Sequence, residues 1–378
     1  MRSFADTLCF ALMLSVGLGV SGCPRTDDVP SDSSRGERSA PSASASTHAP
    51  LSESPVFEPV KVEHEFKAMG THVTFITHTT VKLDKARLQG AFDAAAKEIE
   101  RLEALMSSWR AESDVSRVNR AGGEYVEVSP ETFEVLEKSL WAGEISKGSF
   151  DVTFQSLSLV WKFGDAADEK PRPPTRAQVE PLRRLVDYRK VELDEQGRRV
   201  RIGKDQKLGL GGIAKGYIVD RTVAVLKKHG LSSFLVRAGG DLYGAGVKPS
   251  SDPWVSGIQD PRGQLGSYFA LIKLENHAFS TAGDYARAYE YQGKRYHHII
   301  DPKTGFPATR SRSVTVWAPT ALLADAVDDA VFILGPEEGL KLVESLPDVG
   351  AVIVDANNRV WISERLRNQV ELLSDPTN

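Results

Sequence analysis

The sequence predicts an α+β fold, built as a single large domain over residues 61–372, and two observations support this prediction. The predicted strands and helices are grouped along the chain rather than strictly alternating, which disfavours a doubly wound parallel sheet. The stretch also has an ordinary hydrophobic content and no convincing internal repeat. It can therefore bury a large core, in one sizeable domain or in two closely joined lobes.

The first predicted elements are paired strands and a helix. Residues 62–77 mix apolar and polar side chains in strand fashion on both sides of the segment 68–71. A helix is predicted from Leu83, because apolar residues then recur in alternating steps of four and three. These residues are Leu88, Phe92, Ala95, Ile99, Leu102 and Met106.

A second helix opens the middle of the domain. Ser129 and Pro130 form a favourable N-cap and first-turn pair for it. Residues 165–181 are charged and proline-rich, so we expect an exposed excursion there. A short hairpin is predicted around Gln196 and Gly197.

Strands dominate the second half of the domain. Residues 208–212 lead into a helix that ends at His229, directly before Gly230. Strand-like runs then cover residues 234–236, 254–258, 268–274, 297–300 and 313–317.

Two helices and a hairpin complete the domain. Thr320 is a favourable N-cap for the first helix, and Gly335-Pro336 is its stop signal. The second helix covers residues 336–346, and residues 351–362 read as a hairpin.

The first of these two helices carries three carboxylates in an otherwise apolar sequence. Asp325, Asp328 and Asp329 lie at i, i+3 and i+4, so they share one face of the helix. The apolar remainder predicts that the helix is mostly buried, where neighbouring carboxylates repel and are costly to desolvate. A hard divalent cation, most simply Mg²⁺, would compensate this charge. The alternative is a solvated acidic stripe on a surface helix.

The N-terminal residues predict a targeting signal. Arg2 precedes an apolar run at 8–20 that is too short to span a membrane as a mature helix. The run ends in Val20-Ser21-Gly22-Cys23, which resembles the lipobox of bacterial lipoproteins. We therefore expect a signal peptide at 1–22 and lipidation at Cys23; a cysteine packed in a signal anchor is the alternative. Cys9 would leave with the signal, so disulfides and thiolate sites are excluded from the mature fold.

The flanks of the domain are predicted to be unstructured or short. Residues 23–60 are rich in Ser, Pro and Ala and serve as a flexible tether, and residues 373–378 form a tail. The formal net charge of −4 and the dispersed basic residues give no electrostatic case for nucleic acid. No later segment is long and apolar enough to cross a bilayer.

A glycine-rich turn at 209–216 opens a helix and carries Lys215 in its first turn. Backbone N–H groups, the helix N-terminus and an ammonium together suit a phosphate group. It is not a Walker A loop, because Gly216 follows the lysine. Packing alone explains such a turn equally well.

Four other segments combine polar groups with turns. In 237–244, a tight turn in which Asp241 bonds local backbone is the better explanation. Residues 280–285 end a strand with hydroxyls and a carboxylate that could line a cleft, with a plain turn as the alternative. Residues 148–153 combine an aromatic with an acid, which suits a planar heterocycle, although core packing explains the aromatic equally well. Residues 297–307 place histidine, which is suited to proton transfer near neutral pH, beside a rigid turn.

Together and in this order, these segments resemble the ApbE family, the FAD:protein FMN transferases. The matched segments are 68–71, 113–119, 148–153, 211–216, 238–241, 283–285, 298–305 and 324–328. The resemblance implies a T-fold-like α+β architecture, with FAD as substrate and Mg²⁺ as cofactor. It implies transfer of FMN to a Thr or Ser of a partner protein, typically a membrane-bound subunit of a redox complex. Cleavage of the diphosphate of FAD can drive this transfer outside the cytoplasm, where ATP is absent.

The resemblance also implies roles for individual residues. Asp325 and Asp328 would bind the metal, with Asp329 at the third side-chain position and Gly212 giving a backbone carbonyl. His298 is our candidate for accepting the proton of the partner hydroxyl, supported by Asp284. The residues expected to contact FAD are Met69, Trp109, Ser149, Phe150, Asp151, Gly209, Lys215 and His298.

Four positions depart from the usual residues of the family. Gly209 stands where Asp is usual, Asp329 where Thr is usual and Ala282 where Ser is usual. Trp109 replaces a frequent Tyr, which is a tolerable exchange of aromatics. An extra carboxylate at Asp329 is expected to strengthen cation binding unless one acid stays protonated.

The expected function is Mg²⁺-dependent transfer of FMN from FAD to a Thr or Ser hydroxyl through a phosphoester bond, with release of AMP. The expected location is the extracytoplasmic, or periplasmic, side of the cell membrane, through the lipid anchor. Two alternatives stay open. One is an FAD pyrophosphatase that releases FMN and AMP, and the other is a non-catalytic FAD-binding lipoprotein.

Overall fold

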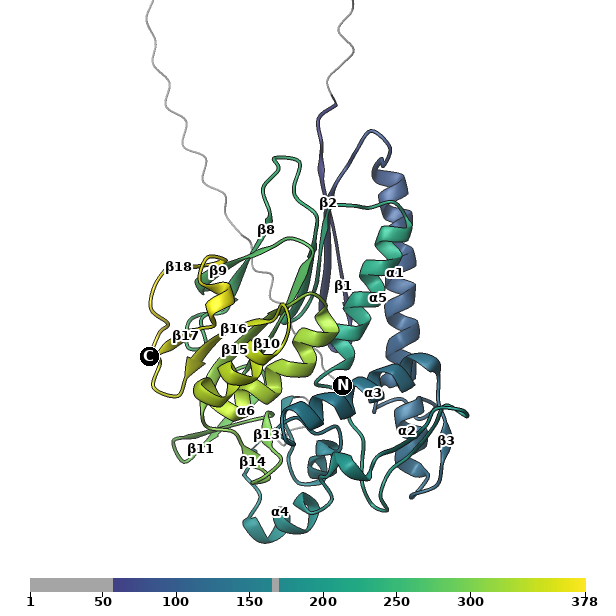
Figure 1. Cartoon of the computed structure of the whole chain (residues 1–378), viewed down its shortest axis with the longest axis vertical. Helices are drawn as coiled ribbons and strands as arrows, with labels where there is room; N and C mark the ends of the chain where they lie inside the picture. Colours follow the sequence, from purple (N-terminus) through teal and green to yellow (C-terminus); the bar gives the residue numbers. More distant parts are fainter. Residues whose placement is uncertain (1–56, 165–169) are drawn as a thin grey trace, which may run out of the picture. The chain divides into compact units, whose positions relative to one another are not determined.

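An eight-stranded sheet organises the protein, in the strand order β1-β2-β6-β7-β10-β15-β16-β17 (Figure 1). Every neighbouring pair in it is antiparallel. The strands are Lys61–Ala68, Thr71–His78, Phe234–Ala238, Asp241–Ala245, His277–Gly283, Ser311–Ala318, Gly350–Asp355 and Val360–Ile362. The protein thus combines helices with an antiparallel main sheet. This architecture confirms the α+β prediction and excludes a doubly wound parallel sheet.

This computed structural model describes residues 57–164 and 170–378. The described part belongs to one compact unit, Val56–Asn378. The predicted signal peptide, Cys23 and nearly all of the tether lie outside the described residues, as does part of the predicted excursion. Among the residues that the structure describes, no helix combines the length and the apolar character needed to cross a membrane.

Three helices cover one face of the main sheet and a small sheet covers the other. The helices are α1 (Lys85–Met106), α5 (Ala214–Lys228) and α6 (Ala321–Ser345). The small sheet, in the order β18-β9-β8, contains Val370–Leu372, Tyr268–Leu274 and Trp254–Gln259. Side chains alternate between the two cores along a strand: Val236 joins the helix-side core and Leu235 the opposite one. This alternation is what fixes the register of a sheet buried on both faces.

Local signals explain most of the helices. Asp84 caps α1, and all six apolar residues of the predicted stripe are buried. Ser129 caps α3 (Pro130–Ile145), as predicted. The sequence prediction missed α2 (Asp114–Arg120) and α4 (Arg176–Arg183). The end of the predicted excursion is therefore wrong, because a capping box between Thr175 and Gln178 starts α4 there despite the prolines.

The remaining elements are short. They are β3 (Val126–Glu127), β4 (Glu192–Asp194), β5 (Arg199–Arg201), β11 (Ala288–Tyr291), β12 (Lys294–His297), β13 (Ile300–Asp301), β14 (Phe306–Pro307) and the 3-10 turns Phe154–Leu159, Tyr188–Lys190 and Glu364–Leu366. Strands β4 and β5 confirm the hairpin around Gln196. The predicted strand at 297–300 is instead divided between two hairpins, which leaves His298 between them.

Helix α6 changes direction at Gly335. This residue has a φ of 77° and a ψ of −179°, so the helical backbone ends there and restarts at Pro336. The predicted stop and the predicted second helix are both confirmed. The first half of α6 lies against β10 and β15, where Figure 1 shows it covering the sheet.

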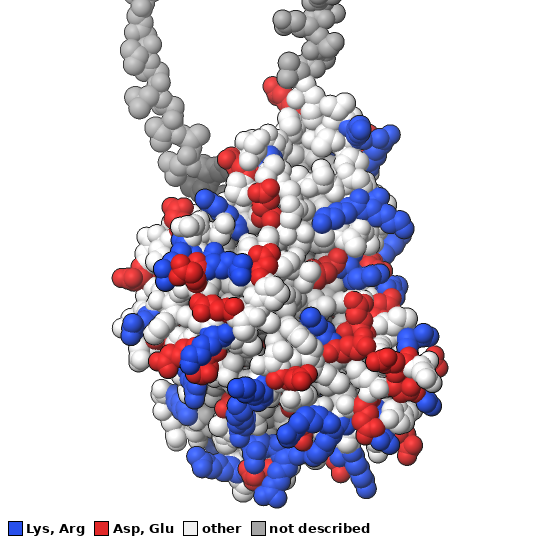
Figure 2. All heavy atoms as spheres, viewed as in Figure 1, with Lys and Arg blue, Asp and Glu red and all other residues white. Residues whose placement is uncertain are grey.

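Charged side chains of both signs cover the face drawn in Figure 2. Lys and Arg are most concentrated at the end where α4 lies, and the two signs are interspersed elsewhere. On α4, Arg183 and the adjoining Arg184 pair with Glu180. The basic charge on α4 is thus partly neutralised within the helix.

Asp220 joins α5 to α6, and its removal is expected to destabilise the fold. Its two carboxylate oxygens accept the backbone N–H groups of Ala321 (2.8 Å) and Leu322 (2.9 Å). These donors at the start of α6 have no partner within the helix. We expect Asp220→Ala to lower the free energy of unfolding by about 2 kcal/mol, measured by urea denaturation.

Asp93→Ala is the control for this variant. Asp93 lies on the exposed face of α1, and among the described residues its side chain accepts only from Gln89. Its replacement should change the free energy of unfolding by no more than about 0.5 kcal/mol. Equal values for the two variants would contradict a capping role for Asp220.

Candidate active site

Two of the three predicted acidic residues of α6 are buried, Asp325 against α5 and Asp328 against β10. Asp325 is 3% exposed and Asp328 is 4% exposed, which confirms burial and rejects the solvated stripe for these two residues. The Asp325 Oδ2 accepts the backbone N–H of Gly216 at 2.8 Å. A Cβ atom at Gly216 would lie 2.3 Å from the Ala321 carbonyl oxygen, so only glycine lets the two helices approach this closely.

The third acid, Asp329, is half-buried and faces the glycine-rich turn. A Cβ atom at Gly212 would lie 2.8 Å from the Asp329 Oδ2 and 3.5 Å from the Phe150 ring. The structure therefore brings together Gly212, Asp329 and Phe150, which were predicted from distant parts of the chain. A side chain at 212 would fill the space in front of this carboxylate.

The acidic cluster carries negative charge that the protein compensates only in part. Burial raises the pKa of Asp325, Asp328 and Asp329, and repulsion from neighbouring carboxylates, Asp241 among them, raises it further. The Lys215 ammonium is the nearest positive group and lies 4.0 Å from the Asp325 Oδ1. Burial alone would lower the pKa of Lys215, but the carboxylates of Asp241 and Asp325 raise it above its ordinary value.

Asp241 and Ser280 complete the surroundings of the cluster. Asp241 is fully buried and accepts a hydrogen bond from the Lys215 ammonium. The Ser280 Oγ lies 2.5 Å from the Asp241 Oδ1 and 2.6 Å from the Asp328 Oδ2. The prediction that Asp241 bonds local backbone is therefore wrong, because its partners come from α5 and β10.

The oxygen atoms of the α6 carboxylates and of the Gly212 backbone are the kind of ligand that a hard divalent cation prefers. Three carboxylates project from one side of α6, and the backbone at Gly212 is open in front of Asp329. Within residues 57–164 and 170–378, no three His, Cys, Asp or Glu side chains are already arranged around one metal position. Asp325 and Asp328 point instead at the donors Gly216 and Ser280. The metal assignment of Asp325, Asp328, Asp329 and Gly212 stays a prediction.

Like His78, His298 has a ring nitrogen that is buried and has no hydrogen-bond partner among the described residues. Its backbone N–H donates to the Arg287 carbonyl at 3.1 Å, and its buried Nδ1 has no partner among the described residues. Burial lowers the pKa of His298 to about 3, and the charges of Arg287 and Lys215 add to the effect. The neighbouring His297 is structural, since its Nε2 bonds the Ala308 carbonyl at 2.8 Å and its ring packs on Phe332.

Asp284 is engaged by a different partner from the one we predicted. Its two oxygens pair with the guanidinium of Arg262, each at 2.7 Å. Its backbone N–H donates to the Arg312 carbonyl. Because both oxygens are occupied by Arg262, a direct role beside His298 stays a prediction.

Five further residues were predicted to contact FAD, and they fall into two groups, of which the first is Ser149 and Met69. The Ser149 Oγ is buried and has no hydrogen-bond partner among the described residues. Met69 has a φ of 52°, and the adjacent Gly70 would place a Cβ atom 3.9 Å from the Arg287 guanidinium. The strained turn at Met69 therefore lies next to the segment that carries His298.

The second group has other contacts or none. Both oxygens of Asp151 accept hydrogen bonds from the protein, from the backbone N–H groups of Thr153 (2.8 Å) and Tyr188 (2.9 Å). Trp109 is 85% exposed. At Gly209, an added Cβ atom would lie 2.7 Å from the Gln155 Oε1, so the Gln155 side chain occupies the space that a side chain at 209 would need. The roles of these residues toward FAD stay predictions.

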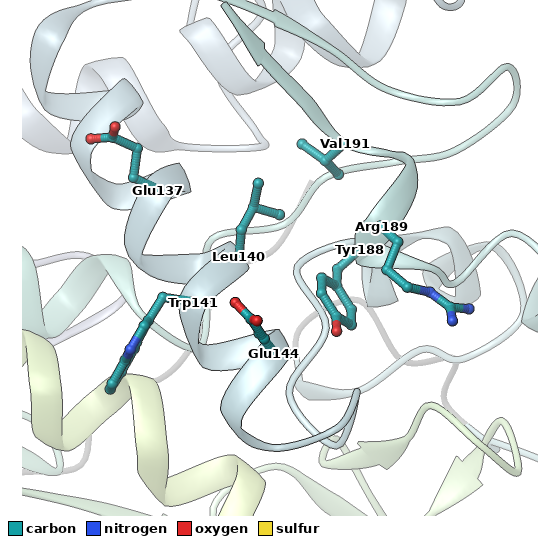
Figure 3. A pocket seen from close by; sticks show the side chains of 7 residues that line it. All are labelled: Glu137, Leu140, Trp141, Glu144, Tyr188, Arg189 and Val191. Carbon is teal, nitrogen blue, oxygen red and sulfur yellow. The ribbon is translucent and has the colours of Figure 1, made fainter. Parts of the chain in front are cut away.

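A groove of about 490 Å³ lies between α3 and the turn at 188–190 (Figure 3). Its lining residues are Glu137, Leu140, Trp141, Glu144, Tyr188, Arg189 and Val191. None of the residues predicted to bind FAD or metal is among them. This groove is therefore not part of the candidate active site, which consists of the acidic cluster, Lys215 and His298.

The lowered pKa of His298 predicts a pH effect on stability. Its ordinary pKa is 6.5, so below that pH the unfolded chain binds a proton that the folded protein does not bind until about pH 3. The free energy of unfolding consequently falls as the pH falls below 6.5. Between about pH 7 and pH 5, we expect the loss to be about 1–2 kcal/mol smaller in His298→Gln than in the wild type. Urea denaturation at both pH values measures this, and identical losses would show that His298 titrates normally.

The chain is similar to several characterised proteins. The model of the ApbE family matches residues 69–353. The FAD:protein FMN transferase of Klebsiella pneumoniae (strain 342) is 29% identical over 308 residues, which cover 80% of this chain and 87% of that protein. The FAD:protein FMN transferase of Treponema pallidum (strain Nichols) is 32% identical over 311 residues, covering 77% and 84%. The crystal structure of the ApbE protein from Thermotoga maritima matches with a TM-score of 0.75 and 31% identity, covering 82% of this chain and 99% of that one.

Proposed function

Because the chain belongs to the ApbE family and is a transferase of FMN from FAD, we propose that it attaches FMN to a Thr or Ser hydroxyl of a target protein. The bond formed is a phosphoester, AMP is released, and Mg²⁺ is the cofactor. The observation that carries this proposal is the buried cluster of Asp325 and Asp328 beside Lys215. Buried carboxylates that repel one another suit a cation, and the ammonium beside them suits a phosphate.

The acidic residues would hold the metal. Asp325, Asp328 and Asp329 would provide carboxylate oxygens, and Gly212 would provide its carbonyl. When bound, Mg²⁺ supplies a Lewis acid that neutralises charge on diphosphate oxygens. Lys215, whose raised pKa keeps it protonated, would bind a phosphate of FAD.

His298 would accept the proton of the acceptor hydroxyl. Its imidazole is neutral at neutral pH, because burial lowers its pKa to about 3, and its Nδ1 has no competing partner among the described residues. The acceptor oxygen forms a bond to the phosphorus of the FMN half, while the bond from that phosphorus to the bridging oxygen breaks. The electron pair leaves with AMP, and the proton passes through His298 to solvent.

We also propose that the enzyme acts at the membrane. The segment Val20-Ser21-Gly22-Cys23 supports lipidation at Cys23, and the low-hydrophobicity tether up to residue 60 supports reach from the anchor to the domain. The acceptor would then be an extracytoplasmic protein, of which a subunit of a membrane redox complex is the natural type.

Mass measurement on a co-expressed acceptor tests this function. Intact-mass analysis of candidate redox subunits should show one FMN adduct when the full chain is present with FAD and Mg²⁺. The adduct should be absent when Asp325→Ala replaces the wild type. AMP release without an adduct would instead establish a pyrophosphatase, and FAD binding without AMP release would establish a binding protein.

A further inference from the structure

We propose that Asp241 and Ser280 are positioning residues that hold Lys215 and Asp328 as one ordered unit. Neither was predicted to act in the site, and the side chains of both bond residues that were. The inference deepens the proposed function and rests on it, because Lys215 is its phosphate-binding residue and Asp328 its metal ligand.

Asp241 fixes the lysine. It stands at the first position of β7, directly after Gly239 and Gly240, and is 0% exposed. A Cβ atom at Gly240 would lie 3.1 Å from the Thr281 carbonyl oxygen, so the glycine permits close approach of β7 and β10 at this point. A fully buried carboxylate requires a cation or several donors, and the Lys215 ammonium meets that need from α5.

Ser280 connects this carboxylate to the acidic helix. Its hydroxyl lies within hydrogen-bond distance of both Asp241 and Asp328, but it has only one proton to donate. The serine therefore orders whichever carboxylate receives the proton and keeps the two acids at a fixed separation. The second oxygen of Asp328 accepts the backbone N–H of Asp329, so Asp328 has little freedom to rotate.

These contacts close a ring through four elements. It runs from Asp325 on α6 to Lys215 on α5, then to Asp241 on β7, Ser280 on β10 and back to Asp328 on α6. Asp325 and Asp328 are one helical turn apart, so α6 itself completes the circuit. Loss of Ser280 would thus free mainly the metal ligand Asp328, whereas loss of Asp241 would release Lys215 and also remove a partner of Ser280.

Direct binding measurements on the full chain test this role. Isothermal titration with Mg²⁺ in the absence of FAD reports on Asp328, and flavin fluorescence in the presence of EDTA reports on FAD binding through Lys215. We expect Ser280→Ala to weaken Mg²⁺ binding about tenfold or more while FAD binding changes less than about threefold. Asp241→Asn should weaken both by about tenfold, because it releases Lys215 from its partner. Ser280→Thr, which keeps the hydroxyl, should restore Mg²⁺ binding.

Thr281→Val is the matched control. Thr281 is adjacent on the same strand, but its hydroxyl pairs with Thr315 on the opposite face of the sheet. This variant should bind Mg²⁺ and FAD as the wild type does. Wild-type binding by folded Ser280→Ala, or equal losses in Ser280→Ala and Thr281→Val, would overturn the positioning role alone. Failure of the wild type to bind either Mg²⁺ or FAD would overturn the proposed function as well. If Asp241→Asn does not fold, the comparison of Ser280→Ala with Ser280→Thr decides the question.

Discussion

Replacement of Asp325 by alanine is expected to abolish FMN transfer and AMP release, with a loss on the order of 10³-fold or more. Asp325 is the most enclosed point of the acidic cluster, because α5 approaches it through Gly216 and its Oδ2 accepts that residue's N–H. The variant removes a metal ligand and also leaves this N–H without its acceptor. AMP release from FAD at saturating Mg²⁺, together with Mg²⁺ titration calorimetry, measures both consequences.

Asp329→Thr is the informative comparison for Asp325→Ala. Asp329 is half-buried and faces Gly212, and threonine would keep an oxygen at this position. We therefore expect only a modest loss of Mg²⁺ affinity, less than about tenfold. Small and equal losses in the two variants would discredit the whole metal assignment.

Much of the fold could be predicted from the sequence because its signals are local. The apolar stripe of α1 repeats within a single helix, and Gly335-Pro336 ends the first half of α6 by backbone conformation alone. The same holds for Ser129, which caps α3 through its own side chain. Each of these features depends on neighbours within a few residues, so no knowledge of the tertiary structure was needed.

The errors in the fold arose where a weak composition signal competed with a specific contact. Residues 176–183 are flanked by prolines and charges, yet the capping box at Thr175 and the burial of Val179 produce a helix. The apolar pair after His298 suggested one continuous strand. The backbone N–H of His298 instead bonds the Arg287 carbonyl, and the chain divides into two hairpins there.

The site was predictable in its residues more than in their contacts. The burial of Asp325 and Asp328 follows from the apolar sequence around them. The partners of Asp241 do not, since Lys215 is 26 residues away and Ser280 is 39 residues away on another strand. A glycine pair before an acid is typical of a local turn, and only the packing of β7 against β10 and α5 directs the acid elsewhere.

His298 is the second residue whose loss should have a large effect. We expect His298→Gln to lower the rate of FMN transfer by about 10²–10⁴-fold, the range found for a general base. Glutamine keeps the approximate size of the side chain but cannot accept and release a proton at neutral pH. Mg²⁺ affinity should stay within about threefold of the wild type, because His298 is not among the proposed metal ligands. Quenched time courses with mass detection measure the rate of FMN transfer, and titration calorimetry measures the Mg²⁺ affinity.

The neighbouring histidine separates proton transfer from structure. His297 bonds the Ala308 carbonyl and packs on Phe332, so His297→Gln should lower stability without a comparable loss of transfer below its melting temperature. If His298 is the proton acceptor, His298→Gln should show a large loss of transfer rate, and His297→Gln should lose mainly stability. Transfer at the wild-type rate in His298→Gln would show that another group accepts the proton. The neutral Nδ1, which has no partner among the described residues, would then serve FAD binding alone.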